Sequence, residues 1–177
     1  GSLVRGEEAA GLTSYLILDG YNVVGATERY RIRATGGLDD SRELLVNDAL
    51  KVAGWTGREI VVVFDAHRGS GPERTELRAG GAVRVVYSAT EESADDVIER
   101  LLGNLDGPAT VYTADFALQR AALARGVSRA TPREFTELLD ELPAVTRSPE
   151  GPRRARISDR LPPETLRRLE EIRRRAK

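Results

Sequence analysis

The stretch IVVVFD, residues 60–65, decides the fold class of this chain. Its unbroken apolar run is typical of a strand that is covered on both faces, and the run ends on Asp65. Two further short runs also end on an aspartate: YLILD ends at Asp19, and TVYTAD ends at Asp115. Helical patterns lie between these runs, so we predict an α/β fold with a doubly wound, mainly parallel sheet between two layers of helices.

The rest of the pattern predicts the connections. Ser93 can cap a helix in which Asp96 is the capping-box partner. Residues 66–81 are rich in glycine, so we expect a partly mobile loop there with at most two turns of helix. If the strands follow the common 3-2-1-4-5 order, Asp19 and Asp115 face each other across the switch point. The other elements are expected as helices over residues 39–53, 116–125 and 132–142, and as strands over residues 82–87 and 127–130.

The chain of 177 residues has an acidic body and a basic tail. Residues 147–177 carry a net charge of +6, and residues 1–146 carry −7. We expect an N-terminal tag or flexible segment over 1–14, a folded domain over 15–146, and a basic linker with a C-terminal helix over 147–177. Such a tail suggests a polyanionic partner, RNA or a ribosome. Its expected RNA-binding residues are Arg167, Arg168, Arg173 and Arg174.

Composition excludes several kinds of site. The chain has no cysteine, which rules out disulfides and thiolate metal sites, and His67 is its only histidine, which argues against zinc. No apolar run approaches the roughly 20 residues of a membrane span, and residues 1–14 show no signal-peptide pattern. We therefore expect no membrane association and a cytoplasmic location.

Aspartates at strand ends suggest a metal site. In an open α/β sheet, ligands bind outside the carboxyl ends of the parallel strands, so Asp19, Asp65 and Asp115 should converge there, with Asp95 from the start of a helix. Each aspartate alone is as well explained by a turn or a helix cap. Together, however, unpaired carboxylates raise one another's pKa, and a hard cation such as Mg²⁺ or Mn²⁺ would neutralise them.

Several other residues could support such a site. Asn22 can hydrogen-bond a carboxylate or a phosphate, and Tyr21 should lie beside the proposed metal. His67 could touch substrate, although a loop or structural role is the more ordinary interpretation. The arginines of the glycine-rich loop could contact phosphates or simply face solvent. These are Arg68, Arg74 and Arg78.

Four motifs resemble those of YacP-like proteins, which are bacterial NYN-domain endoribonucleases with a PIN-like fold that also occur in cyanobacteria and plastids. The motifs are DGYNVVG at 19–25, VVFDAH at 62–67, ESADD at 92–96 and TAD at 113–115. The resemblance extends from Tyr15 to the C-terminal helix. It implies an NYN nuclease domain over residues 15–146 and a location in the plastid stroma if the source is a plant or an alga.

This resemblance also implies functional residues. The acidic site would consist of Asp19, Asp95 and Asp115, with Asp65 as an outer residue. Association with ribosomes and cleavage of translated mRNA are implied as well. Where relatives often carry a serine, this chain has Ala114, and the neighbouring Thr113 could replace the lost hydrogen bond. The supporting residues would be Asn22, Tyr21, Asp96, Thr113 and His67.

The leading hypothesis is a Mg²⁺- or Mn²⁺-dependent endoribonuclease. The alternative is a non-catalytic RNA- or ribosome-binding module that retains the PIN-like fold. A phosphohydrolase of the haloacid dehalogenase type is disfavoured because Tyr21 occupies the place of its second aspartate. A response-regulator receiver is excluded because only Lys51 and Lys177 are lysines, and neither follows a late strand. The sequence makes no prediction of oligomeric state.

Overall fold

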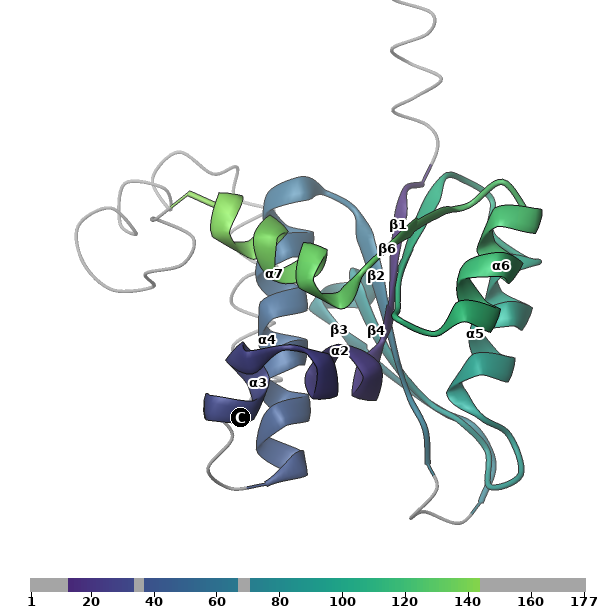
Figure 1. Cartoon of the computed structure of the whole chain (residues 1–177), viewed down its shortest axis with the longest axis horizontal. Helices are drawn as coiled ribbons and strands as arrows, with labels where there is room; N and C mark the ends of the chain where they lie inside the picture. The colour runs from purple at the N-terminus through teal and green to yellow at the C-terminus, as the bar shows by residue number, and fades with distance from the viewer. Residues whose placement is uncertain (1–12, 34–36, 67–70, 144–177) are drawn as a thin grey trace, which may run out of the picture.

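A computed structural model describes residues 13–33, 37–66 and 71–143 of the chain. Its centre is a six-stranded sheet with the strand order β3-β4-β2-β1-β5-β6 (Figure 1). The strands are β1 (Tyr15–Asp19), β2 (Glu59–Phe64), β3 (Arg74–Arg78), β4 (Val83–Tyr87), β5 (Ala109–Tyr112) and β6 (Ser128–Ala130). The helices are α2 (Gly20–Ala26), α3 (Glu28–Arg33), α4 (Leu38–Thr56), α5 (Ala94–Leu102), α6 (Phe116–Ala124) and α7 (Pro132–Glu141), with a 3₁₀ turn η1 (Ala79–Gly81).

Five of the six strands are parallel, in the order that the sequence predicts. The central strand β1 pairs with β2 and β5, and β4 and β6 continue the sheet on either side. The predicted α/β fold and its doubly wound order are therefore confirmed. None of the helices in the described part of the chain is long and apolar enough to cross a bilayer.

Two features of the fold differ from the prediction. The expected loop over residues 66–81 contains the strand β3, which pairs antiparallel with β4 at the edge of the sheet. Its sequence, RTELR, is charged and largely exposed, as is usual for an edge strand, so it has no apolar pattern to reveal it. The tight turn considered after Asp19 is instead the helix α2, and α3 follows it.

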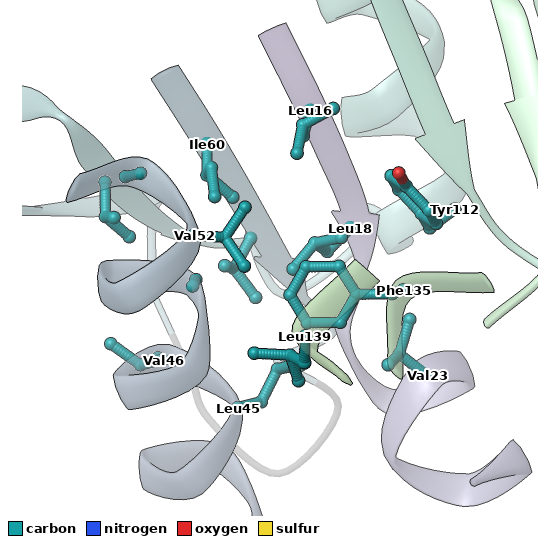
Figure 2. Packing of buried hydrophobic residues seen from close by; sticks show 14 of the residues in the cluster. Leu16, Leu18, Val23, Leu45, Val46, Val52, Ile60, Tyr112, Phe135 and Leu139 are labelled. Carbon is teal, nitrogen blue, oxygen red and sulfur yellow. The ribbon is translucent and has the colours of Figure 1, made fainter. Parts of the chain in front are cut away.

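The sheet separates two hydrophobic cores. Helices α2, α3, α4 and α7 cover one face, and α5 and α6 cover the other (Figure 1). Side chains alternate along a strand, so Leu16 and Leu18 enter the α4 core, whereas Ile17 enters the α5–α6 core. Figure 2 shows the first core, where Phe135 and Leu139 of α7 meet Leu18 and the helix α4.

The start of α2 depends on a glycine. A Cβ at Gly20 would lie 2.4 Å from the ring of Phe64 and 2.8 Å from the carbonyl oxygen of Val63. Gly20 therefore allows the chain to leave β1 and form a helix directly against the end of β2. This fixes the position of Asp19, the last residue of β1.

A candidate acidic active site

The sheet register brings the strand-end aspartates to one edge. Asp19 lies opposite Val63 of β2, and the pairing of β1 with β5 brings Thr113 level with Asp19 on the other side. Asp65 and Asp115 each follow two residues further along. Each of these aspartates, and Thr113, lies an even number of residues after a strand residue of the α5–α6 core, namely Ile17, Val63 or Val111. Because side chains alternate between the two faces of a sheet, theirs project toward the face covered by α5 and α6.

The edge is also a topological switch point. After β1 the chain enters α2 on one face, and after β5 it enters α6 on the other (Figure 1). The first turn of α5, which carries Asp95, and the first turn of α6, which follows Asp115, both lie on the side of the carboxylates. This is the position at which open α/β sheets bind their ligands.

Thr113 links the carboxylates. It is fully buried, and its hydroxyl donates a hydrogen bond of 2.8 Å to Oδ2 of Asp19. The same hydroxyl oxygen accepts a 3.0 Å bond from the backbone N–H of Asp115. The side chain of Gln119 donates to the carbonyl oxygen of Thr113 at 2.8 Å. Thr113 therefore holds the strand end that presents Asp115 against the side chain of Asp19.

Asp19 is a buried carboxylate in an acidic setting. Its exposed fraction is only 7%. The pKa of Asp19 is raised from 3.8 to about 6. Burial is the main cause, the hydrogen bond from Thr113 opposes it, and the charges of Asp95, Asp115 and Asp65 add to it. The burial of a carboxylate near three others would be costly to the fold. The site is thus chemically suited to a positively charged ligand.

Asp95 and Asp115 form a second close pair. Burial, followed by the charge of Asp115 and a hydrogen bond with it, raises the pKa of Asp95. One oxygen of Asp115 also accepts a 3.1 Å bond from the N–H of Leu118 and so caps α6. Asp65 lies at the margin of the cluster, where the Ser88 hydroxyl approaches its carboxylate at 3.5 Å.

The residues fit a hard divalent cation by donor chemistry. In the described part of the chain, no group of three or more His, Cys, Asp or Glu side chains is arranged to hold a metal ion. Mg²⁺, however, usually keeps several waters and takes only one or two protein carboxylates, with the substrate phosphates supplying the rest. Carboxylate oxygens that raise one another's pKa are the donors such an ion prefers.

Asn22 and Asp96, two of the predicted supporting residues, serve the backbone. Asn22 accepts a 2.7 Å hydrogen bond from the N–H of Ala114 and thereby ties α2 to the segment before α6. Asp96 is occupied in the capping box with Ser93, each side chain accepting from the other's N–H at 3.1 Å. Both contacts fix the backbone of segments that border the site.

Tyr21 and the loop arginines lie elsewhere. The Tyr21 hydroxyl accepts a 2.9 Å bond from Arg42 of α4, and its ring packs on Phe64, which belongs to the other core. The guanidinium group of Arg78 lies 3.6 Å from a carboxylate oxygen of Glu43 and 3.5 Å from one of Glu76. Arg74 is largely exposed, and its Cζ atom lies 4.3 Å from the ring centroid of Tyr87. The other predicted residues, His67, Arg68, Arg167, Arg168, Arg173 and Arg174, lie outside the described residues.

Comparisons with known proteins agree with the fold. The family model for the YacP-like NYN domain matches residues 16–174. The protein named "Uncharacterized protein YacP" of Bacillus subtilis is 32% identical over 135 residues, which cover 75% of this chain and 76% of that protein. The crystal structure of Rae1 (YacP) from Bacillus subtilis matches with a TM-score of 0.60 at 28% identity, over 90% of each chain. A crystal structure of a tryptophan-to-leucine mutant of Rae1 matches with the same TM-score at 27% identity, over 72% of this chain and 76% of the mutant.

Proposed function

The chain belongs to the YacP-like NYN family, and from this premise we propose that it is a divalent-metal-dependent endoribonuclease. The NYN domain has a PIN-like nuclease fold, which suggests an RNA substrate. The single observation that carries the proposal is Asp19: a buried carboxylate at the end of the central strand, with its pKa raised to about 6, beside Asp95 and Asp115.

In this proposal, Asp19, Asp95 and Asp115 hold one or more Mg²⁺ or Mn²⁺ ions, directly or through water, with Asp65 at the rim. When bound, such an ion activates water and stabilises the charge that develops on the scissile phosphate. Thr113 orients Asp19 through its hydroxyl, so that the carboxylate does not rotate away from the site. Hydrolysis would leave a 5′-phosphate and a 3′-hydroxyl.

The ionisation of the carboxylates gives the proposed activity a pH dependence. The pKa of Asp19 is raised to about 6, so in the metal-free protein this ligand is half protonated near that pH. A cation competes with the proton for the carboxylate, so metal binding should strengthen as pH rises through 6. The activity at limiting metal should therefore increase over the same range.

The finer biological role is also part of the proposal. We propose mRNA as the substrate, the ribosome as a partner and the cytoplasm as the location. The support for this is the family resemblance and the net charge of +6 over residues 147–177, which suits a polyanion.

The test compares the parent with Asp19→Asn on defined RNAs in the presence of Mg²⁺, Mn²⁺ or EDTA. We expect metal-dependent internal cleavage by the parent and a loss of more than about 100-fold in the variant. A matched control is Asp140→Asn, which changes an exposed aspartate on α7 and should leave cleavage intact. Equal cleavage by Asp19→Asn would refute the site. Salt-sensitive RNA binding without any cleavage by the parent would instead support the non-catalytic alternative.

A further inference from the structure

Phe116 is an exposed aromatic residue next to the acidic site. It is the first residue of α6 and directly follows Asp115, and its exposed fraction is 77%. By contrast, Phe64 and Phe135, the other two phenylalanines, are fully buried. Single exposed apolar side chains are common on protein surfaces, so the position of Phe116 directly beside the carboxylates, and not its exposure alone, makes it a candidate contact for a ligand.

The chain that follows Phe116 is basic. No acidic residue occurs between residues 116 and 133, although the chain up to residue 146 is acidic on balance. Arg120 lies one helical turn after Phe116 and is exposed on the same side of α6, because residues four apart are neighbours on a helix. Arg129 of β6 lies opposite Val111, which packs in the α5–α6 core, and so it projects from the sheet edge on the side of α6.

Neither arginine is neutralised by the fold. Arg120 and Arg129 are exposed, and neither forms an ion pair with another described residue. The opposite side of α6 is occupied by Leu118 and Ala122, which are fully buried against the sheet. The outer side of α6 therefore presents the ring of Phe116, the guanidinium group of Arg120 and the exposed side chain of Leu123, and it begins beside the carboxylates. Arg129 lies next to this surface, at the edge of the sheet.

Single-stranded RNA matches this combination. Every unpaired base has a face that can stack on an aromatic ring, and each phosphate can bind an arginine. The bases of a duplex are already stacked on their neighbours, so their faces are not available to a side chain. A protein partner would be expected to need a larger apolar patch than the side chains of Phe116 and Leu123, the two large exposed apolar residues of α6.

We propose that the outer side of α6 binds single-stranded RNA: an unpaired base stacks on Phe116, the adjoining backbone binds Arg120, and the next phosphodiester lies beside the acidic cluster. The inference rests on the proposed nuclease function for the orientation of the strand, and it adds the substrate class, unpaired RNA. Phe116 is in this view a substrate-positioning residue, distinct from the carboxylates.

The test is direct binding in EDTA, where cleavage does not interfere. A fluorescently labelled RNA of about 12 nucleotides is measured by anisotropy, alone and annealed to its complement. We expect the full-length parent to prefer the single strand. We expect Phe116→Ala to weaken single-strand binding about tenfold while Phe116→Trp retains it, because only the alanine removes the stacking surface. Arg120→Gln should weaken binding and reduce its salt dependence by about one counterion.

Two matched variants control for general effects. Trp55 is also an exposed aromatic, at 54%, and Arg58 an exposed arginine, but both lie before β2 at the opposite edge of the sheet. Trp55→Ala and Arg58→Gln should bind as the parent does. Circular dichroism of each variant checks that it folds.

The outcomes separate this inference from the nuclease proposal. Unchanged single-strand affinity in both Phe116→Ala and Arg120→Gln, or a preference of the parent for the duplex, would overturn the inference even if the parent cleaves RNA. Phe116-dependent binding by a parent that never cleaves would support the binding site and refute the nuclease function. Loss of binding in the Trp55→Ala control as well would also count against the assignment to α6.

Discussion

Asp19→Asn should make the metal-free protein more stable at neutral pH. In the folded protein, burial and neighbouring carboxylates raise the pKa of Asp19 from 3.8 to about 6. One pKa unit is worth about 1.36 kcal/mol, so the ionised side chain destabilises the metal-free fold by up to about 3 kcal/mol. The substitution removes the charge and keeps the shape and an oxygen that can accept from Thr113.

The pH dependence of this effect has a definite sign. Below about pH 3, Asp19 is protonated in both the folded and the unfolded chain, and its ionisation does not affect stability. Between about pH 3 and 6, the unfolded chain ionises first, so the stability of the parent falls as pH rises. Above pH 6 the full cost is present. We therefore expect the free energy of unfolding of Asp19→Asn to exceed that of the parent by about 2–3 kcal/mol at pH 8, and the difference to vanish below about pH 3.

Urea denaturation followed by circular dichroism at several pH values, in EDTA, measures this difference. Asp140→Asn, at an exposed position of α7, should stay within about 0.5 kcal/mol of the parent. Addition of Mn²⁺ should then stabilise the parent in proportion to its occupancy and leave Asp19→Asn nearly unchanged. If the variant is no more stable than the parent at pH 8, or if the difference is the same at every pH, the assignment of Asp19 as a destabilising buried carboxylate is wrong.

Two other substitutions test the framework of the site. Thr113→Val removes the hydroxyl that donates to Asp19 and accepts from the N–H of Asp115. It should lower the free energy of unfolding by about 1–3 kcal/mol at neutral pH and raise the pKa of Asp19 further. RNA cleavage should fall about 10–100-fold. Thr113→Ser keeps the hydroxyl, so a serine variant as impaired as the valine one would show that the hydrogen bonds are not the cause. Gly20→Ala would bring a Cβ within 2.4 Å of the Phe64 ring, and we expect a loss of about 1–3 kcal/mol in urea denaturation. A melting curve like that of the parent would mean that α2 can shift away from β2 at little cost.

The parts of the fold that the sequence predicted are those that carry a strong apolar pattern. The short, unbroken and β-branched run over 60–64 favours a strand covered on both sides, and such strands are typical of parallel sheets. β3 escaped prediction because a strand that pairs on one side only needs no apolar face. α2 escaped because its sequence, GYNVVGA, has low helix propensity. Burial of Val23 and Val24, a tertiary effect, stabilises it instead.

The acidic residues of the site were predictable, but their mutual arrangement was not. The three apolar runs that end on Asp19, Asp65 and Asp115 indicated that these carboxylates converge at one edge of the sheet. The face of the sheet toward which these side chains project depends on the strand register. Once the strand pairing is known, their even spacing from buried strand residues of the α5–α6 core places them on the α5–α6 side. The buried position of Thr113 between two carboxylates needed the structure, because nothing in a TAD tripeptide distinguishes it from an ordinary turn.

The sequence offers two competing explanations for the aspartates, helix capping and metal binding. The structure supports capping for some of these aspartates and not for others. Asp115 and Asp96 do cap α6 and α5, and each uses a carboxylate oxygen for a backbone N–H. Asp19 occupies the N-cap position of α2 yet makes no capping hydrogen bond with its side chain. A buried carboxylate that lacks the usual stabilisation of a helix start, and whose neighbours raise its pKa, destabilises the fold. Such a residue is best explained by a ligand that binds its ionised form, which is why Asp19 rather than Asp115 is the decisive position for the experiments above.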